Sequence, residues 1–124
     1  MAMFVISKQE NGNFKFEYTS RKGTPIFTSI TCKNKSDCEM IINAIRSDVQ
    51  AFTFTRKSYS SKHYFFRIAK DGYVLATSRR YSSEQSLNNG IVRLLDTLHK
   101  GEILDFSIND FVFPEEESLG ETGS

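Results

Sequence analysis

Residues 20–34 of this chain read SRKGTPIFTSITCKN, and residues 70–83 read KDGYVLATSRRYSS; both stretches contain a turn glycine followed by an apolar strand and a Thr-Ser pair. The two pairs of Thr-Ser are 49 residues apart. Upstream, NFKFEY at residues 13–18 aligns with HYFFRI at residues 63–68, 50 residues apart, across a one-residue gap. The pattern indicates a tandem duplication. Each half is too small to bury its own apolar face securely, so we expect the halves to share one core.

In the first half the apolar spacing changes once, after Ser29. Before it, apolar residues alternate with polar ones, as in strands with one buried face. After it, the spacing is that of an amphipathic helix, whose first turn would be closed by Asn34 with Asp37 or by Ser36 with Glu39. The strand positions are Phe4, Ile6, Phe14, Phe16 and Tyr18, and the helix positions are Cys38, Ile41, Ile42, Ile45 and Val49.

The second half repeats this order and adds a strand. Alternation over residues 51–55, 64–68 and 73–78 predicts a three-strand meander. A helix follows from about Ser83, and Ser82 with Gln85 has the pattern of a capping box. Its apolar face would carry Leu87, Ile91, Leu94, Leu95 and Leu98. Residues 103–108 predict a closing strand, so the order is three strands, helix, three strands, helix, strand.

Several residues of the second half resemble the YegP family, small bacterial proteins of unknown function built from one or two such repeats. The match rests on Gly72, Val74, Leu75, Thr77, Ser78, Tyr81, Ser82, Ser83, Gly90 and Ile91. The first half departs from the pattern, with Cys32 in place of Tyr and Ile41 in place of Gly. The resemblance covers roughly residues 4–108. It implies an α+β fold in which two tandem β-β-β-α-β repeats form one antiparallel sheet, with two helices on one face and the C-terminal strands exchanged between repeats, as in a pseudo-dimer.

The net charge of +1 hides an uneven distribution. Five of the 15 acidic residues and none of the 16 basic ones lie in residues 109–124, so residues 1–108 carry a formal charge of +6. We therefore expect one domain over residues 1–108, with repeats at about 1–50 and 51–108, and a disordered acidic tail at 109–124. The sequence has no apolar run near the roughly 20 residues of a membrane span and no signal-peptide pattern, which makes a cytoplasmic location the default expectation.

The sequence offers little support for catalysis. Cys32 and Cys38 have no zinc-ligand spacing and are expected to be free, buried thiols, and no metal or cofactor is expected. His99 lies at the predicted end of the second helix, where a histidine favours the helix dipole. A Cys38–His63 dyad is an alternative that nothing in the sequence brings together, so we expect a binding or structural module rather than an enzyme.

Binding of nucleic acid or another anion is the sharper alternative. Residues 54–82 contain seven basic residues against the single acid Asp71, interleaved with aromatic residues, which is a composition suited to phosphate contacts and base stacking. If Tyr64, Phe66 and Ile68 face the helices, Phe65 and Arg67 lie on the open face of the sheet. The same composition is also expected without any ligand, because an antiparallel sheet needs a polar face toward solvent and basic residues at its edges prevent pairing with other sheets. The candidate binding residues are Phe65, Arg67, Arg79, Arg80 and Tyr81, the last three lying just before a helix N-terminus.

The third alternative is a module for assembly. A tandem copy supplies within one chain the partner that a single repeat would need, so we expect a monomeric pseudo-dimer. A homodimer remains an alternative, because the apolar residues Phe111, Val112 and Phe113 could join two chains or pack back on the core. The sequence names no partner.

Overall fold

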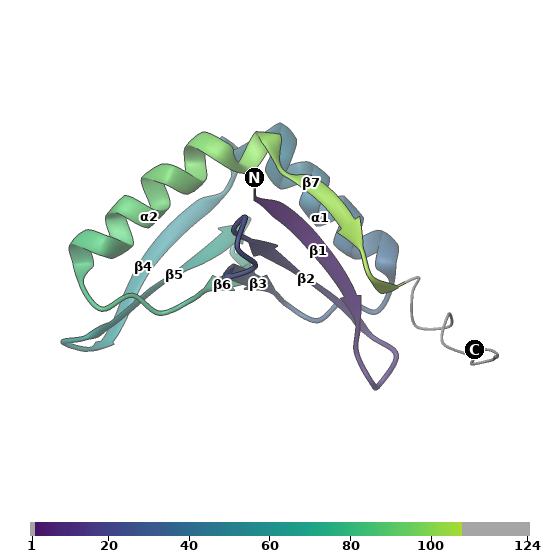
Figure 1. Ribbon diagram of the computed structural model, residues 1–124, viewed down its shortest axis with the longest axis horizontal. Helices are drawn as coiled ribbons and strands as arrows, with labels where there is room; N and C mark the ends of the chain where they lie inside the picture. Colours follow the sequence, from purple (N-terminus) through teal and green to yellow (C-terminus); the bar gives the residue numbers. More distant parts are fainter. Residues whose placement is uncertain (1, 108–124) are drawn as a thin grey trace.

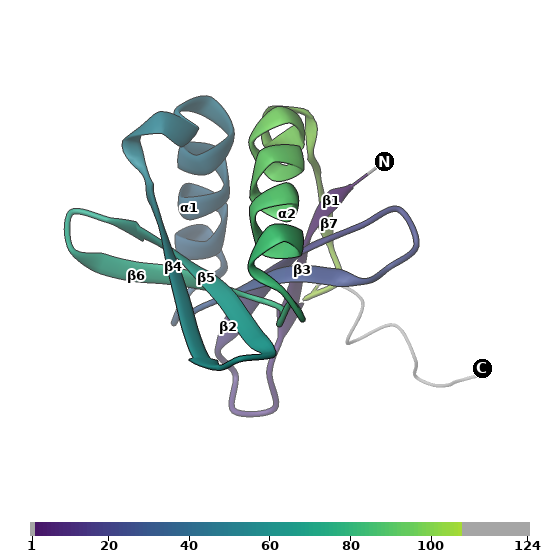
Figure 2. The ribbon, with the colours of Figure 1, turned by 90° about the vertical axis from the view of Figure 1, so that its left-hand side faces the viewer.

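The computed structural model describes residues 2–107, which form one seven-stranded sheet and two α-helices. Both helices lie on the same face of the sheet, which bends like an arch, so the other face is free of helices (Figures 1 and 2). In chain order the elements are β1 (Met3–Lys8), β2 (Phe14–Thr19), β3 (Pro25–Ser29), α1 (Lys35–Ser47), β4 (Thr53–Ser60), β5 (His63–Lys70), β6 (Tyr73–Ser78), α2 (Glu84–Thr97) and β7 (Glu102–Asp105). Single 3-10 turns, Val49–Ala51 and Leu98–Lys100, follow the two helices. The predicted α+β order is confirmed.

The sheet is mixed, with strand order β4-β5-β6-β3-β2-β1-β7. Five neighbouring pairs are antiparallel, but β7 runs parallel to β1, with Met3 opposite Glu102 and Ile6 opposite Asp105. The predicted all-antiparallel sheet is therefore wrong at this edge. The reason is the connection: after α2 the chain crosses to the far edge of the sheet and enters it in the direction of β1.

Two complete β-β-β-α-β units would supply eight strands, and residues 2–107 form seven. The strand that follows α1 is β4, which also begins the second meander and pairs with β5. The strand that follows α2 is β7, which pairs with β1 at the other end of the sheet.

Residues 108–124 lie outside the described residues. The expectations for the acidic tail and for residues 111–113 fall in this range.

The core lies between the helices and the sheet and is rich in aromatic rings. Phe4, Phe16, Tyr18 and Phe27 are almost fully buried, and the Tyr18 and Phe27 rings stack with their centroids 5.4 Å apart. Most of the predicted apolar positions are confirmed as buried. Leu95 is an exception at 44% exposed, because the buried stripe of α2 is Leu87, Ile91 and Leu94, continued by Leu98, and Leu95 lies beside it.

The helix starts differ in detail from those predicted. Asn34 is the N-cap of α1 but its side chain makes no capping hydrogen bond. Ser83 is the N-cap of α2, and its Oγ accepts a hydrogen bond from the Ser86 amide in a capping box. The predicted Ser82–Gln85 box is thus wrong by one residue. None of the helices in residues 2–107 is long and apolar enough to cross a membrane.

The serine of each Thr-Ser pair has the same buried role. Ser29 Oγ accepts a hydrogen bond from the Phe16 amide at 2.8 Å, and Ser78 Oγ accepts one from the Phe66 amide at 2.8 Å. Each hydroxyl donates in turn to the carbonyl of the next residue. These bonds tie the end of β3 to β2 and the end of β6 to β5, which explains why both stretches contain the pair.

Candidate functional site

The open face of the second half carries the side chains that alternate with the core residues of β4 and β5. Phe66 and Ile68 are fully buried under the helices, whereas Arg67 is exposed and Phe65 is half-buried. Because successive strand residues point to opposite faces, Phe65 and Arg67 lie on the helix-free face, as predicted. Lys57 pairs with Phe65 across the two strands and shares this face.

Aromatic rings and arginines gather at one end of this face. The Tyr59 ring stacks on the His63 ring with centroids 5.2 Å apart and lies 6.1 Å from the Phe65 ring. The guanidinium carbon of Arg80 lies 5.3 Å from the centre of the Tyr59 ring, and that of Arg67 lies 5.5 Å from the centre of the Phe65 ring. We call these five residues the aromatic–arginine cluster. Its rings and cations together offer stacking surfaces and positive charge to a ligand.

The β4–β5 hairpin positions this cluster. The strand pairing shifts register between Ser58 and Ser60, so that Tyr59 sits at an irregularity in β4. Ser60 Oγ lies 2.6 Å from His63 Nδ1 in a hydrogen bond and also accepts one from the Lys62 amide. These bonds close the turn and hold the His63 ring beside Tyr59, which is 57% exposed. Sequence reasoning missed Tyr59 and His63 as site residues.

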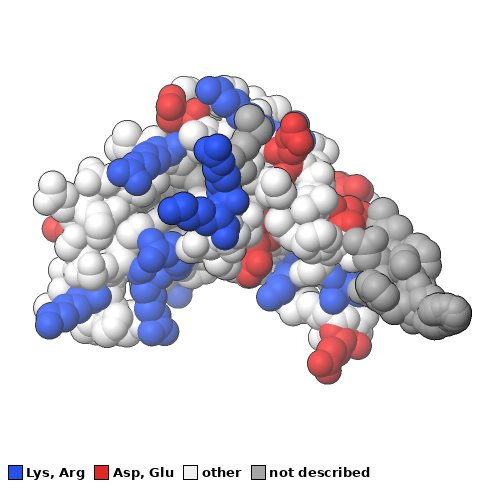
Figure 3. Space-filling view, viewed as in Figure 1, with Lys and Arg blue, Asp and Glu red and all other residues white. Residues whose placement is uncertain are grey.

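The charge of the open face changes across the sheet. Arg67 pairs with Thr77, Thr77 with Thr28, and Thr28 with Glu17, so these four residues form a row along one face. Glu17 is 50 residues before Arg67 and takes the corresponding place in the first half. Figure 3 views the molecule from the side, with the helices at the top; on this side Lys and Arg side chains lie mostly over the centre and left, and more Asp and Glu side chains lie toward the right.

The five predicted site residues do not form one site. Phe65, Arg67 and Arg80 belong to the open face, but Tyr81 is only 9% exposed and its ring stacks against the core residue Phe66. The guanidinium carbon of Arg79 lies 4.8 Å from the centre of the Tyr81 ring, so it belongs to the helix side. The neighbouring arginines therefore serve opposite faces of the sheet.

Tyr81 and Gly90 are matched in size. A Cβ atom on Gly90 would lie 2.7 Å from Tyr81 Oη and 3.0 Å from two of its ring carbons. In the first half the corresponding residues are Cys32 and Ile41, a small residue facing a large one. If the two halves are tandem copies, the two departures of the first half from the YegP pattern amount to one exchange of volume between strand end and helix.

The structure does not bring the Cys38–His63 dyad together. Cys38 lies on α1 and is fully buried in the core, where burial, with Cys32 nearby, raises the pKa of its thiol to about 12. His63 lies in the cluster on the opposite face of the sheet. Within residues 2–107, no group of three or more His, Cys, Asp or Glu side chains is placed to hold a metal ion.

Comparison with known proteins gives one consistent result. No family model matches the chain. The chain is 28% identical over 90 residues to the UPF0339 protein YegP of Escherichia coli, an alignment covering 71% of this chain and 82% of that protein. It is also 28% identical over 95 residues to a UPF0339 protein of Shewanella oneidensis, covering 75% of this chain and 86% of that protein.

Solved structures agree in fold. The solution NMR structure of Escherichia coli YegP matches with a TM-score of 0.75 at 23% identity, covering 86% of this chain and 93% of that chain. The solution NMR structure of a UPF0339 protein from Shewanella oneidensis matches with a TM-score of 0.78 at 22% identity, covering 89% and 95%. The YegP structure is described as that of a protein of unknown function, so it indicates no activity. The resemblance of this chain to the YegP family is therefore confirmed in sequence and in fold.

Proposed function

We propose that this protein is a binding module for single-stranded nucleic acid, and that the aromatic–arginine cluster is its contact surface. The observation that supports this most directly is the placement of an arginine guanidinium within 5.5 Å of each of two ring centres, those of Tyr59 and Phe65, on a helix-free sheet face. A base can stack on an aromatic ring, while an arginine beside it contacts the phosphate or extends the stack.

A single strand suits this surface better than a duplex. The rings lie on the face of a sheet, where unstacked bases can reach them, as in sheet-based RNA-binding domains. The formal charge of +6 over residues 1–108 favours a polyanion, and Lys57, Arg67 and Arg80 supply cations at the cluster. Binding here requires no catalytic group, and the only dyad that the sequence suggested is divided between two faces.

We also propose that the two halves are tandem copies in a monomeric pseudo-dimer, of which only the second half has kept the binding surface. The paired hydrogen bonds of Ser29 and Ser78 support the duplication. The contrast between Glu17 and Arg67 supports the division of labour, because a carboxylate at the corresponding place repels phosphate.

Fluorescence anisotropy with labelled oligo(dT) and oligo(U) of about 15 nucleotides tests the proposal, since single-strand sites of this kind span roughly 4–16 nucleotides. Phe65→Ala and Tyr59→Ala should each weaken binding about 5- to 150-fold through lost stacking, at about 1–3 kcal/mol per base. If three cations contact phosphates, a plot of the logarithm of the binding constant against the logarithm of the salt concentration should have a slope of about −2. Arg46→Ala, on α1, is the matched control and should bind like the parent.

Charge reversal sharpens the test. Arg67→Glu should abolish binding, whereas Glu17→Arg should strengthen it by extending the basic row across the sheet. Equal weakening by Arg67→Glu and Arg46→Glu would show that only net charge matters. Failure of the parent to bind either oligonucleotide at low salt would remove the proposal.

A further inference from the structure

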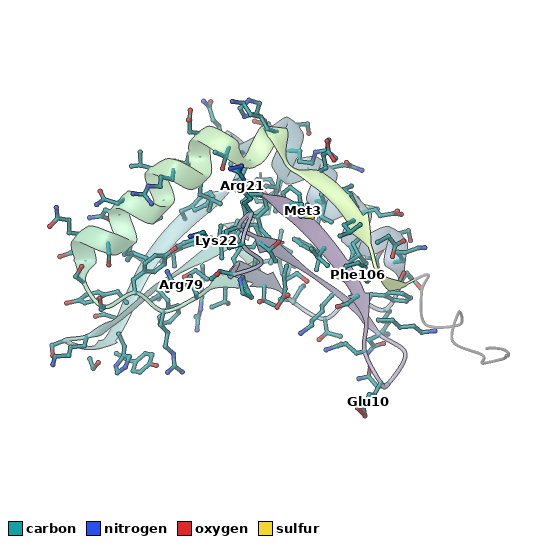
Figure 4. The ribbon with its side chains drawn as sticks, viewed as in Figure 1. Met3, Glu10, Arg21, Lys22, Arg79 and Phe106 are labelled. Atoms are coloured by element: carbon teal, nitrogen blue, oxygen red, sulfur yellow. The ribbon has the colours of Figure 1, made fainter. Side chains whose placement is uncertain are left out.

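A groove opens on the helix side of the sheet, apart from the aromatic–arginine cluster. It has a volume of about 410 Å³ and lies between α2 and the turn from Ser20 to Thr24 that joins β2 to β3. Arg79, Tyr81, Asn89, Gly90 and Arg93 are among the residues that line it. Figure 4 shows Arg79 on the same face of the molecule as Arg21 and Lys22 of that turn. The volume lies within the roughly 300–1,000 Å³ typical of small-molecule sites.

The groove is positively charged. Arg79 and Arg93 both line it, and no Asp or Glu of the described residues does. Neither arginine forms an ion pair within residues 2–107, where the ion pair found is Lys35–Asp105. Two guanidinium groups beside one cavity, with no carboxylate to neutralise them, favour an anionic ligand.

The Tyr81 hydroxyl adds a polar group to the groove. Tyr81 is 9% exposed, and its Oη is open to solvent, since Gln9 Oε1 is the one buried side-chain atom without a hydrogen-bond partner among the described residues. It lines the groove together with Gly90, whose missing side chain leaves room for the tyrosine ring. Asn89, which lines the same groove, is exposed. Both polar groups are therefore available to a ligand in the groove.

The corresponding place in the first half lacks both arginines, the tyrosine and the asparagine. At a separation of 49 residues, Arg79 corresponds to Ile30 and Arg93 to Ala44, while Asn89 corresponds to Met40 and Tyr81 to Cys32. A shallow pocket there is lined by Ile30, Cys32, Met40 and Ile41, together with one charge of each sign, Lys33 and Asp37. Two arginines beside a groove are therefore a feature of the second half alone.

We infer that this groove binds a small molecule through a phosphate group, either inorganic phosphate or a phosphomonoester. Two guanidinium charges match a phosphate dianion, and the hydroxyl of Tyr81 and the amide of Asn89 can donate to its remaining oxygens. The site is independent of the proposed nucleic-acid surface, since Arg79 and Arg93 lie on the helix side and the cluster lies on the open face.

Titration of ¹⁵N-labelled protein with inorganic phosphate and with ribose 5-phosphate, at constant ionic strength, tests the inference by NMR. We expect saturable shifts of the Arg79, Gly90 and Arg93 amides. Arg79→Ala and Arg93→Ala should each raise the dissociation constant about tenfold or more, as loss of a charged hydrogen bond does. Tyr81→Phe should raise it less. Arg46→Ala is a control that has the same net charge as the two arginine variants and should bind like the parent.

Three results would overturn the inference. The first is the absence of saturation by either phosphate probe up to about 20 mM, a limit that corresponds to negligible affinity. The second is equal weakening by Arg46→Ala, which would indicate unspecific attraction. The third is tighter binding of citrate than of ribose 5-phosphate, which would favour carboxylates. Oligonucleotide binding that survives Arg93→Ala, with phosphate binding lost, would separate this site from the proposed interface.

Discussion

The fit of Tyr81 over Gly90 makes the effect of Gly90→Ala depend on its neighbour. In the middle of a helix this substitution ordinarily stabilises a protein by about 1 kcal/mol, because glycine is the poorer helix former. Here the new Cβ would lie 2.7 Å from Tyr81 Oη and 3.0 Å from two ring carbons, so the ring, which stacks on Phe66, would have to shift. Overpacking of this kind costs about 1–3 kcal/mol.

The net result should be a loss of up to about 2 kcal/mol in the free energy of unfolding, the overpacking cost less the gain in helix propensity. In a Tyr81→Cys background the contact is gone, and Gly90→Ala should stabilise by about 1 kcal/mol. The sign of the effect therefore reverses. The coupling energy of the double-mutant cycle should be about 1–3 kcal/mol. Gly90→Ile should show the same reversal more strongly, because Tyr81→Cys with Gly90→Ile reproduces the Cys32–Ile41 pair.

Urea unfolding followed by circular dichroism under reducing conditions gives the required free energies. Val92→Ala is the control within α2, since Val92 is 65% exposed and its truncation changes helix propensity without touching the tyrosine. If Gly90→Ala stabilises the parent by as much as it stabilises Tyr81→Cys, Tyr81 does not close over Gly90 and the explanation of the two departures from the YegP pattern is refuted.

Three further predictions concern the core and its edge. Gly101→Ala should cost about 1–3 kcal/mol, or roughly 4 °C in melting temperature per kcal/mol, because its Cβ would lie 2.8 Å from the buried Phe4 ring; thermal unfolding measures this. The pKa of the Cys38 thiol is raised to about 12, so the folded protein keeps a proton that the unfolded protein loses above about pH 8.5. The free energy of unfolding should therefore fall as pH rises between these two values, and it should fall less steeply in Cys38→Ala. Urea unfolding at several pH values measures both. Burial would raise the pKa of Asp105, but hydrogen bonds from Ser107 and Lys35 outweigh this effect and lower the pKa. Asp105→Asn should therefore reduce the free energy of unfolding by about 0.5 kcal/mol at pH 7, and this difference should vanish as pH falls below the lowered pKa. Equal destabilisation at acid pH would contradict the prediction.

Apolar spacing was sufficient to predict the elements and most of the core. Alternation at Phe16 and Tyr18, and again at Phe66 and Ile68, fixes which face of each strand is buried, because a shift of one residue would expose every ring. The direction of β7 carried no such signal. Its four residues have the same pattern whether they pair parallel or antiparallel, and only the crossing after α2 decides between them.

The candidate site was predicted less completely, for two reasons. Arg79 and Arg80 follow the end of β6, and alternation continued from Thr77 would place Arg79 rather than Arg80 on the open face, the reverse of what the structure shows. The position of Tyr59 depends on the register shift in β4, which no residue pattern in the sequence marks. The groove joins Arg93 of α2 to the turn at Ser20, a contact between segments far apart in the chain, so only the folded structure reveals it.

The most direct test of the proposed interface is an NMR titration of the ¹⁵N-labelled protein with unlabelled oligo(dT), which maps binding residue by residue. The largest shifts should occur at Lys57, Tyr59, His63, Phe65 and Arg67, and they should shrink as the salt concentration rises. The corresponding face of the first half, at Val5 and Glu17, should remain unchanged. Shifts confined to the groove residues, or spread equally over both halves of the open face, would contradict the proposed interface.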